Sequence, residues 1–215
     1  MTSRFWVVPF VSALVVLVVA AITLPARGQS AAAPTYSVGD TWVRKIGSEM
    51  REVKVTKVEE GGTWFTGGRR DCQTCLTFFD KNLTLLRVTD ASGKDVDVTQ
   101  MNFVPLGSNW KLYDFPLEVK KTWSFTATGY SRGRTGTYKA DNVVEAYEDA
   151  KTPAGTLKAF RIGRRWTLEG QGTGGTFRVN WKDIFWFAPD TKSIVKFTSD
   201  GRNAEEWELA SYSLK

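Results

Sequence analysis

The chain contains no histidine among its 215 residues. Histidine is the general base of Ser-His-Asp and Cys-His sites, the commonest zinc ligand and the usual haem ligand, so its absence excludes these forms of chemistry. Cysteine is nearly as scarce, with only Cys72 and Cys75. Two thiolates are too few for a structural zinc site, which takes four sulfur or nitrogen ligands. The sequence therefore predicts no metal site, no cofactor and no catalytic residues of these kinds.

Helical periodicity is also missing after the first thirty residues. From residue 36 onward, short runs alternate apolar and polar side chains and are separated by turn residues, which is typical of β-strands. Apolar residues occupy every second position in 177–181, and the alternation continues in the opposite phase in 184–188. Such a phase change is typical of a β-bulge, which bends a sheet. We predict an all-β fold with a strongly curved antiparallel sheet, either a roll or a partial barrel, preceded by an N-terminal signal helix.

Residues 1–30 have the composition of an export signal. Arg4 precedes an apolar stretch at 5–24, and Ala26-Arg27-Gly28 offers small residues where a signal peptidase cleaves. We expect cleavage after Gly28 or Ser30, and location of the mature protein in the periplasm or the cell envelope. The alternative is an uncleaved anchor, because about 20 apolar residues can span a bilayer. In that case residues 5–24 would be the membrane contact.

Composition indicates that residues 31–215 form one domain. Nine tryptophans and an aromatic content of 13% supply enough apolar area for a core of this size. The formal net charge of +6 includes two arginines of the leader. The remaining charge favours anionic surfaces mildly and is only weak evidence for nucleic acid, so we do not expect a nucleic-acid partner.

Cys72 and Cys75 form a C-x-x-C pair with three chemical interpretations. Haem attachment is excluded because Leu76 follows where histidine is needed. A redox site of the thioredoxin type needs its first cysteine at a helix N-terminus, which lowers the thiol pKa, but a strand is predicted here. A structural disulfide across a turn is therefore the main prediction. A thiol-disulfide redox role stays open as the alternative.

Two segments that contain glycine are predicted to be hairpin turns. Pro153 and Gly155 specify a turn within 152–156. Glycines at three positions of 170–175 fit the G-x-G-x-x-G spacing, but the dinucleotide fingerprint requires a helix to follow. Residues 176–181 have the pattern of a strand instead, so this segment is predicted to be a turn.

A basic cluster with neighbouring tryptophans is the candidate ligand site. Guanidinium groups beside indole rings can pair with and stack on an anionic glycan or a lipid headgroup. Solvated residues on a strand are the alternative interpretation. The candidate residues are Arg161, Arg164, Arg165, Trp166, Trp181 and Trp186.

Six segments carry short motifs in a recurring order: Val38–Trp42, Phe115–Trp123, Thr152–Ile162, Trp186–Pro189, Ile194–Lys196 and Glu208–Tyr212. This order resembles a bacterial exported (periplasmic) family defined as a domain of unknown function. Its pattern is VGDTW, FPLxVGKTW, VPAGTFKAFRI, WYAP, VK and ELxSY, and it matches essentially the whole mature chain. Lys120 stands where the family tends to have glycine, and Phe187 where it tends to have tyrosine. The resemblance implies an extracytoplasmic all-β protein and supplies no catalytic residues.

The sequence thus favours a non-catalytic binding or structural module of the cell envelope. A curved sheet rich in aromatic residues offers a concave face for an apolar or glycan ligand. The predicted partners are a lipid, a glycan or another envelope protein. The alternatives are an enzyme of unrecognised type and a redox protein that uses Cys72 and Cys75.

Overall fold

The computed structural model describes residues 29–67, 69, 71–101, 104–131, 133–172, 174–201 and 206–215. The predicted signal helix and Gly28, one of the two predicted cleavage positions, therefore lie outside the described residues, whereas the other position, Ser30, is described. Within the described part of the chain, no helix is long and apolar enough to cross a membrane.

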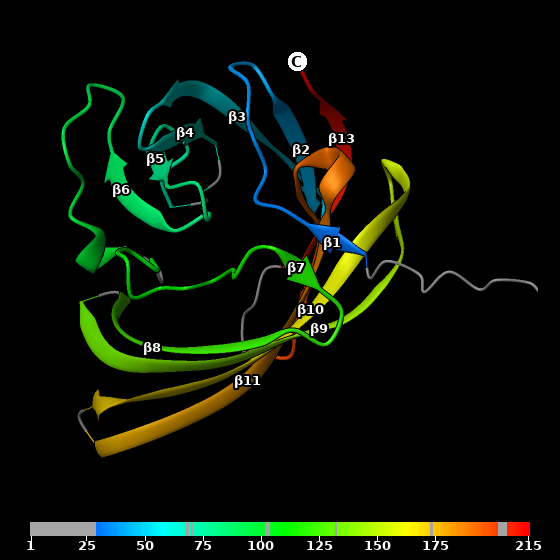
Figure 1. Ribbon diagram of the computed structural model, residues 1–215. Helices are drawn as coiled ribbons and strands as arrows, with labels where there is room; N and C mark the ends of the chain where they lie inside the picture. Colours follow the sequence, from blue (N-terminus) through cyan, green and yellow to red (C-terminus); the bar gives the residue numbers. More distant parts are fainter. Residues whose placement is uncertain are drawn as a thin grey trace, which may run out of the picture.

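Eleven antiparallel strands form the main sheet, in the order β6-β5-β4-β3-β2-β13-β12-β11-β10-β9-β8 (Figure 1). A second, two-stranded sheet pairs β1 with β7. Two single-turn 3₁₀ helices, η1 (Val98–Gln100) and η2 (Pro189–Thr191), accompany the strands. The strands are β1 (Ser30–Ala31), β2 (Thr41–Ile46), β3 (Glu49–Glu59), β4 (Gly62–Thr66), β5 (Leu76–Phe79), β6 (Leu85–Thr89), β7 (Leu117–Glu118), β8 (Thr122–Ser131), β9 (Arg134–Thr152), β10 (Gly155–Gly172), β11 (Gly175–Ala188), β12 (Ser193–Ser199) and β13 (Trp207–Ser213).

The predicted all-β, antiparallel architecture is confirmed. In Figure 1 strands β8 to β11 sweep in a curve along one side, and strands β3 to β6 curl on the other. Both predicted hairpin turns are present, because Thr152 pairs with Gly155 between β9 and β10, and Gly172 pairs with Gly175 between β10 and β11. In each case the chemistry of the turn residues is local, which is why the sequence predicts it well.

The sheet is not closed into a barrel, since β6 and β8 are its two edge strands. One short segment nevertheless contacts both edges. Leu106 forms an isolated parallel bridge with Leu85 of β6, and Val104 forms an antiparallel bridge with Tyr130 of β8. Segment 104–106 therefore covers backbone groups that an open edge would otherwise present to another chain.

The predicted position of the phase change in β11 is wrong. Asp183 and Phe187 are both buried, so the inward phase of residues 177–181 continues along the strand as far as Phe187. The pairing with β12 shifts register between Trp186 and Phe187, and this irregularity is the bulge. Asp183 is a polar residue at an inward position, so the alternation of apolar residues alone does not locate the bulge.

Lys120 has a backbone conformation that favours glycine, and this gives a first prediction. Its φ of 75° lies in the left-handed region, which costs an L-residue about 1–2 kcal/mol and costs glycine almost nothing. We expect Lys120→Gly to raise the free energy of unfolding by about 0.5–1 kcal/mol, after the larger entropy loss of glycine is subtracted. Urea unfolding of the variant measures this. Lys120→Ala, which keeps the Cβ atom, should show no such gain, and an equal gain in both variants would contradict the backbone explanation.

Candidate functional site

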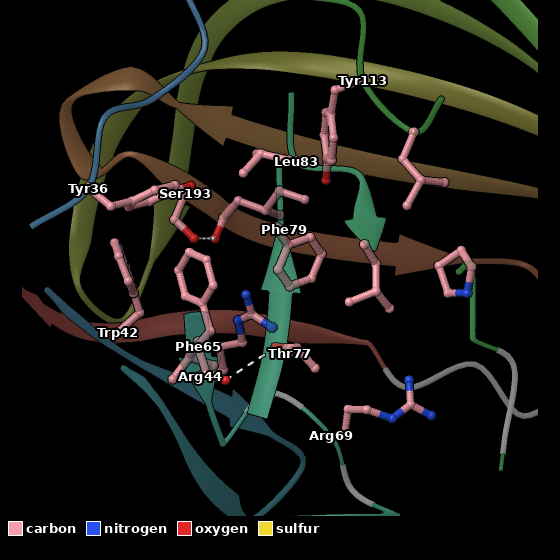
Figure 2. Close-up of a pocket in the computed structure, with 15 residues that line it drawn as sticks. Tyr36, Trp42, Arg44, Phe65, Arg69, Thr77, Phe79, Leu83, Tyr113 and Ser193 are labelled. Carbon is pink, nitrogen blue, oxygen red and sulfur yellow. Dashed lines mark hydrogen bonds between the residues drawn. The ribbon is translucent and has the colours of Figure 1, made fainter. Parts of the chain in front are cut away.

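A partly open cavity of about 290 Å³ lies between β2–β5 and the start of β12 (Figure 2). Residues 105–113, which run from β6 towards β8, cover part of it. Most of the lining is apolar or aromatic. The lining residues are Tyr36, Trp42, Arg44, Val53, Phe65, Arg69, Thr77, Phe79, Leu83, Leu85, Pro105, Leu112, Tyr113, Ser193 and Ile194.

Four aromatic rings form one wall of the cavity. The ring centroids of Tyr36 and Phe65 are 5.0 Å apart, and those of Phe65 and Phe79 are 5.6 Å apart, both in edge-to-face arrangements. The Tyr36 and Trp42 rings meet edge to face at 5.7 Å. An edge-to-face ring pair is stabilised by more than the burial of its apolar area. We therefore expect this wall to be formed before a ligand binds.

The polar ends of these rings are bound to the backbone beyond the cavity. The Tyr36 hydroxyl donates to the carbonyl of Lys192 at 2.9 Å, and Trp42 Nε1 donates to the carbonyl of Thr191 at 2.7 Å. Burial raises the pKa of Tyr36 far above its ordinary value, so this hydroxyl keeps its proton. The η2 turn is thereby fastened behind the aromatic wall, and the ring faces are left for apolar contact.

Among the described residues, Arg44 has no acidic side chain as a hydrogen-bond or ion-pair partner. Its Nε is buried and makes no hydrogen bond to any described residue. The guanidinium carbon lies 4.2 Å from the centre of the Trp207 ring, a cation–π contact. Arg51 stands directly opposite on β3, so a like charge adjoins it. Burial, helped by Arg51, lowers the pKa of Arg44 to about 10, and the guanidinium is charged at neutral pH.

The hydroxyl of Tyr113 lies on the side of the cavity opposite the β2 floor (Figure 2). Burial raises its pKa, and nearby Arg164 and Arg44 lower it by less. Tyr113 is positioned by its neighbours in the chain: the Leu112 carbonyl accepts a hydrogen bond from Arg164, and the Lys111 carbonyl accepts one from Trp123 Nε1 at 2.9 Å. The long strands therefore hold this cover segment in place.

Three residues of the predicted ligand cluster lie together in the core and away from the cavity. Arg164 is only 2% exposed and donates to Asn142 Oδ1 at 2.6 Å. Trp166 Nε1 donates to Asp183 Oδ2 at 2.6 Å, and its ring stacks on Trp181 with centroids 5.4 Å apart. Desolvation raises the pKa of Asp183, and its hydrogen bonds with Ser199 and Trp166 lower that pKa by less. These side chains join β9, β10 and β11.

The other three predicted residues lie elsewhere on the same strands. Arg161 pairs with Glu145 at 3.0 Å and with Glu148 at 3.4 Å, and Trp186 Nε1 donates to Glu148 at 2.9 Å. Arg165 is exposed. The structure thus separates the six predicted residues into three groups. One group is buried, the second consists of Arg161 and Trp186 with their glutamate partners, and Arg165 is exposed alone. None of the six lines the described cavity.

The two cysteines form a disulfide in the turn that precedes β5. Cys75 is buried against Leu85, Val88 and Val104, which belong to the core beside β6. This position suits a structural clip. A nucleophilic thiol has to be accessible and lies in electropositive surroundings, and Cys75 lies in an apolar core instead.

Sequence reasoning missed Arg44, although a signal was present. Trp42 and Arg44 are two residues apart on β2 and therefore share one face of the strand. A cation in phase with a core tryptophan indicates either a buried ion pair or a ligand contact. The lining residues from the loop, such as Tyr113, had no comparable signal because their position depends on distant strands.

No protein-family model and no curated protein matches the sequence. Three solved structures are similar to the chain. The hypothetical lipoprotein YmcC from Escherichia coli is 12% identical, with 85% of this chain and 88% of that chain covered and a TM-score of 0.49. A predicted lipoprotein from Parabacteroides distasonis is 14% identical, with coverage of 86% and 100% and a TM-score of 0.47. A predicted exported protein with a YmcC-like fold from Bacteroides fragilis is 12% identical, with coverage of 85% and 99% and a TM-score of 0.46.

Proposed function

We propose that the protein is an exported, non-catalytic binding module of the cell envelope, which holds an apolar ligand in the cavity over β2–β5. The observation that carries this proposal is the pre-formed aromatic wall beside an open volume of about 290 Å³. That volume lies at the small end of ligand pockets, which span roughly 300–1,000 Å³ and are mostly apolar with a few polar groups.

The location is supported by two features of the chain. The leader at 1–30 has the composition of an export signal. The Cys72–Cys75 disulfide suits an oxidising compartment, because cytosolic thiols are kept reduced. Both features favour the periplasm or another envelope compartment.

A binding role fits the polar groups of the cavity better than an enzymatic one. The hydroxyls of Thr77 and Ser193 donate to the backbone carbonyls of Phe65 and Ile194, so neither is paired with a general base. The lining residues described here include no carboxylate and no cysteine. Within the described part of the chain, no three or more His, Cys, Asp or Glu residues are grouped so that they could hold a metal ion.

Filling the cavity tests this function. We expect Leu112→Trp to weaken binding of the neutral fluorescent probe N-phenyl-1-naphthylamine at least tenfold, because the larger side chain occupies volume that the ligand needs. Leu112 lines the cavity from the cover segment, and its backbone carbonyl remains free to accept from Arg164. Fluorescence titration measures the dissociation constant, and thermal unfolding verifies that the variant is folded.

Leu86→Trp is the matched control. Leu86 lies on β6 next to the lining residue Leu85 but is 40% exposed and does not line the cavity. The control should bind the probe as the wild type does. Equal binding by all three proteins, or no binding by the wild type, would overturn the cavity as the ligand site.

A further inference from the structure

The cavity contains a cation that has no acidic partner among the described residues. Arg44 Nε is buried and makes no hydrogen bond within the described part of the chain, which is a costly state for a polar group of a charged side chain. The described groups that act electrostatically on Arg44 are Tyr36, Tyr113 and Arg51. Two are neutral hydroxyls at ordinary pH and the third is another cation, so none of them neutralises the guanidinium.

The second cation of the lining differs from Arg44 in this respect. Arg69 donates through Nε and Nη2 to both carboxylate oxygens of Asp71, at 2.9 and 2.8 Å. Such a two-bond pair satisfies the charge of Arg69. Arg44 is therefore the position where an anionic group from outside the chain would be bound most strongly.

We infer that the ligand is an anionic amphiphile, whose apolar tail packs on the aromatic wall while its anionic head group accepts a hydrogen bond from Arg44. This inference rests on the proposed function and specifies its ligand class. The juxtaposition that supports it is an arginine that lines an apolar cavity and whose buried Nε has no hydrogen-bond partner among the described residues, with the Tyr113 hydroxyl on the facing side (Figure 2). A carboxylate or a phosphate head group has the required charge and acceptor oxygens.

The volume of the cavity limits the length of the tail. With about 30 Å³ taken as the space of one water-sized group, the cavity of about 290 Å³ holds roughly ten such groups. A methylene is of comparable size, so a single ten-carbon chain is the appropriate probe. Two full-length acyl chains do not fit inside this volume.

The test compares three probes that share a ten-carbon chain and differ in the head group. Decanoate carries a carboxylate, decyl phosphate carries a phosphate, and decanol is neutral. Each displaces N-phenyl-1-naphthylamine from full-length protein freed of bound lipid, at neutral pH. We expect the wild type to bind the better of the two anions about 10–100-fold more tightly than decanol, the factor that one charge-assisted hydrogen bond supplies. The anion that binds more tightly relative to decanol, decanoate or decyl phosphate, identifies the head group as a carboxylate or a phosphate.

Arg44→Met is expected to abolish this preference and to retain decanol binding. Methionine removes an uncompensated buried charge and keeps an unbranched side chain, so the variant should fold. If R44M fails to fold, R44Q provides the same comparison. Arg51→Met is the matched control, because Arg51 lies opposite Arg44 on β3 but does not line the cavity, and it should keep most of the preference.

The outcomes separate the two proposals. Equal affinity of the wild type for decanol and both anions would overturn the anionic ligand while leaving the apolar cavity intact as the binding site. An anion preference that persists in R44M and R44Q would also overturn it. Absence of binding for all three probes would reject the proposed function itself.

Discussion

Replacing Asp40 with alanine is expected to lower the free energy of unfolding by about 3 kcal/mol, because it removes three hydrogen bonds to one buried carboxylate. Asp40 is fully buried at the start of β2. Its oxygens accept from the backbone N–H of Ser37 at 2.9 Å, from the N–H of Lys215 at 2.8 Å and from Lys192 Nζ at 2.9 Å. One carboxylate therefore joins the segment before β2, the end of the chain and the residue after η2.

Urea unfolding measures the loss, and Asp190→Ala is the matched control. Asp190 lies in η2, two residues from Lys192, but its side chain is exposed. Removal of an exposed carboxylate should change the free energy of unfolding by no more than about 0.5 kcal/mol. Similar losses in the two variants would contradict the assigned role of Asp40.

The same carboxylate gives the protein a specific acid sensitivity. Burial acts to raise the pKa of Asp40, but the hydrogen bonds from Lys215, Ser37 and Lys192 outweigh it and hold the pKa below the ordinary value of 3.8. A carboxyl whose pKa is lower when folded stabilises the fold above its unfolded pKa, and this contribution disappears as the pH falls through the folded pKa. The stability difference between wild type and Asp40→Ala should therefore be constant near neutral pH and shrink below about pH 4. A difference independent of pH would argue against this charge state.

Arg164→Ala is expected to lower the free energy of unfolding still more, by about 4 kcal/mol. The substitution leaves a void and removes the hydrogen-bond donor of buried polar groups. The guanidinium donates to Asn142 on β9 and to the Leu112 carbonyl of the cover segment, and it lies 4.6 Å from the Phe185 ring centre. Because it fastens residues 111–113 to the long strands, its loss should also weaken probe binding in the cavity.

Arg165→Ala provides a stringent control for Arg164. The two arginines are adjacent on β10, and their side chains point to opposite faces. Arg165 is exposed, so its removal should leave both unfolding and probe binding close to wild type. Thermal unfolding and fluorescence titration on both variants decide the matter. Comparable effects from the two substitutions would contradict the distinction between them.

Local chemistry accounts for the parts of the fold that the sequence predicts correctly. Pro153 and Gly155 restrict the backbone directly, and so the hairpin between β9 and β10 needs no knowledge of distant residues. The same is true of the C-x-x-C disulfide, whose two residues lie three positions apart. Alternation of apolar residues likewise predicts strands wherever one face is buried.

Partners that are distant in sequence decide the parts that were not predicted. Arg164 was assigned to a ligand surface because it is charged, yet it occupies an inward position between Ile162 and Trp166 on β10. Its partner, the Leu112 carbonyl, lies 52 residues away in the sequence. A local sequence pattern cannot predict a contact between residues so far apart. Arg44 was missed for the same reason. In both cases the informative signal was a cation in phase with core residues, which marks a buried contact to be identified.

The position of β13 in the sheet has a consequence for the order of folding. Strands β2 to β6 and strands β8 to β12 each pair with their neighbours in sequence, so each set closes only short loops. The two sets are joined through β13, which lies between β2 and β12 and pairs Ser213 with Thr41. Contacts so distant in sequence form slowly, and β13 is synthesised after both sets are available to fold. The cavity takes lining residues from both sets, so we expect it to form only at the last step of assembly, when β13 joins them.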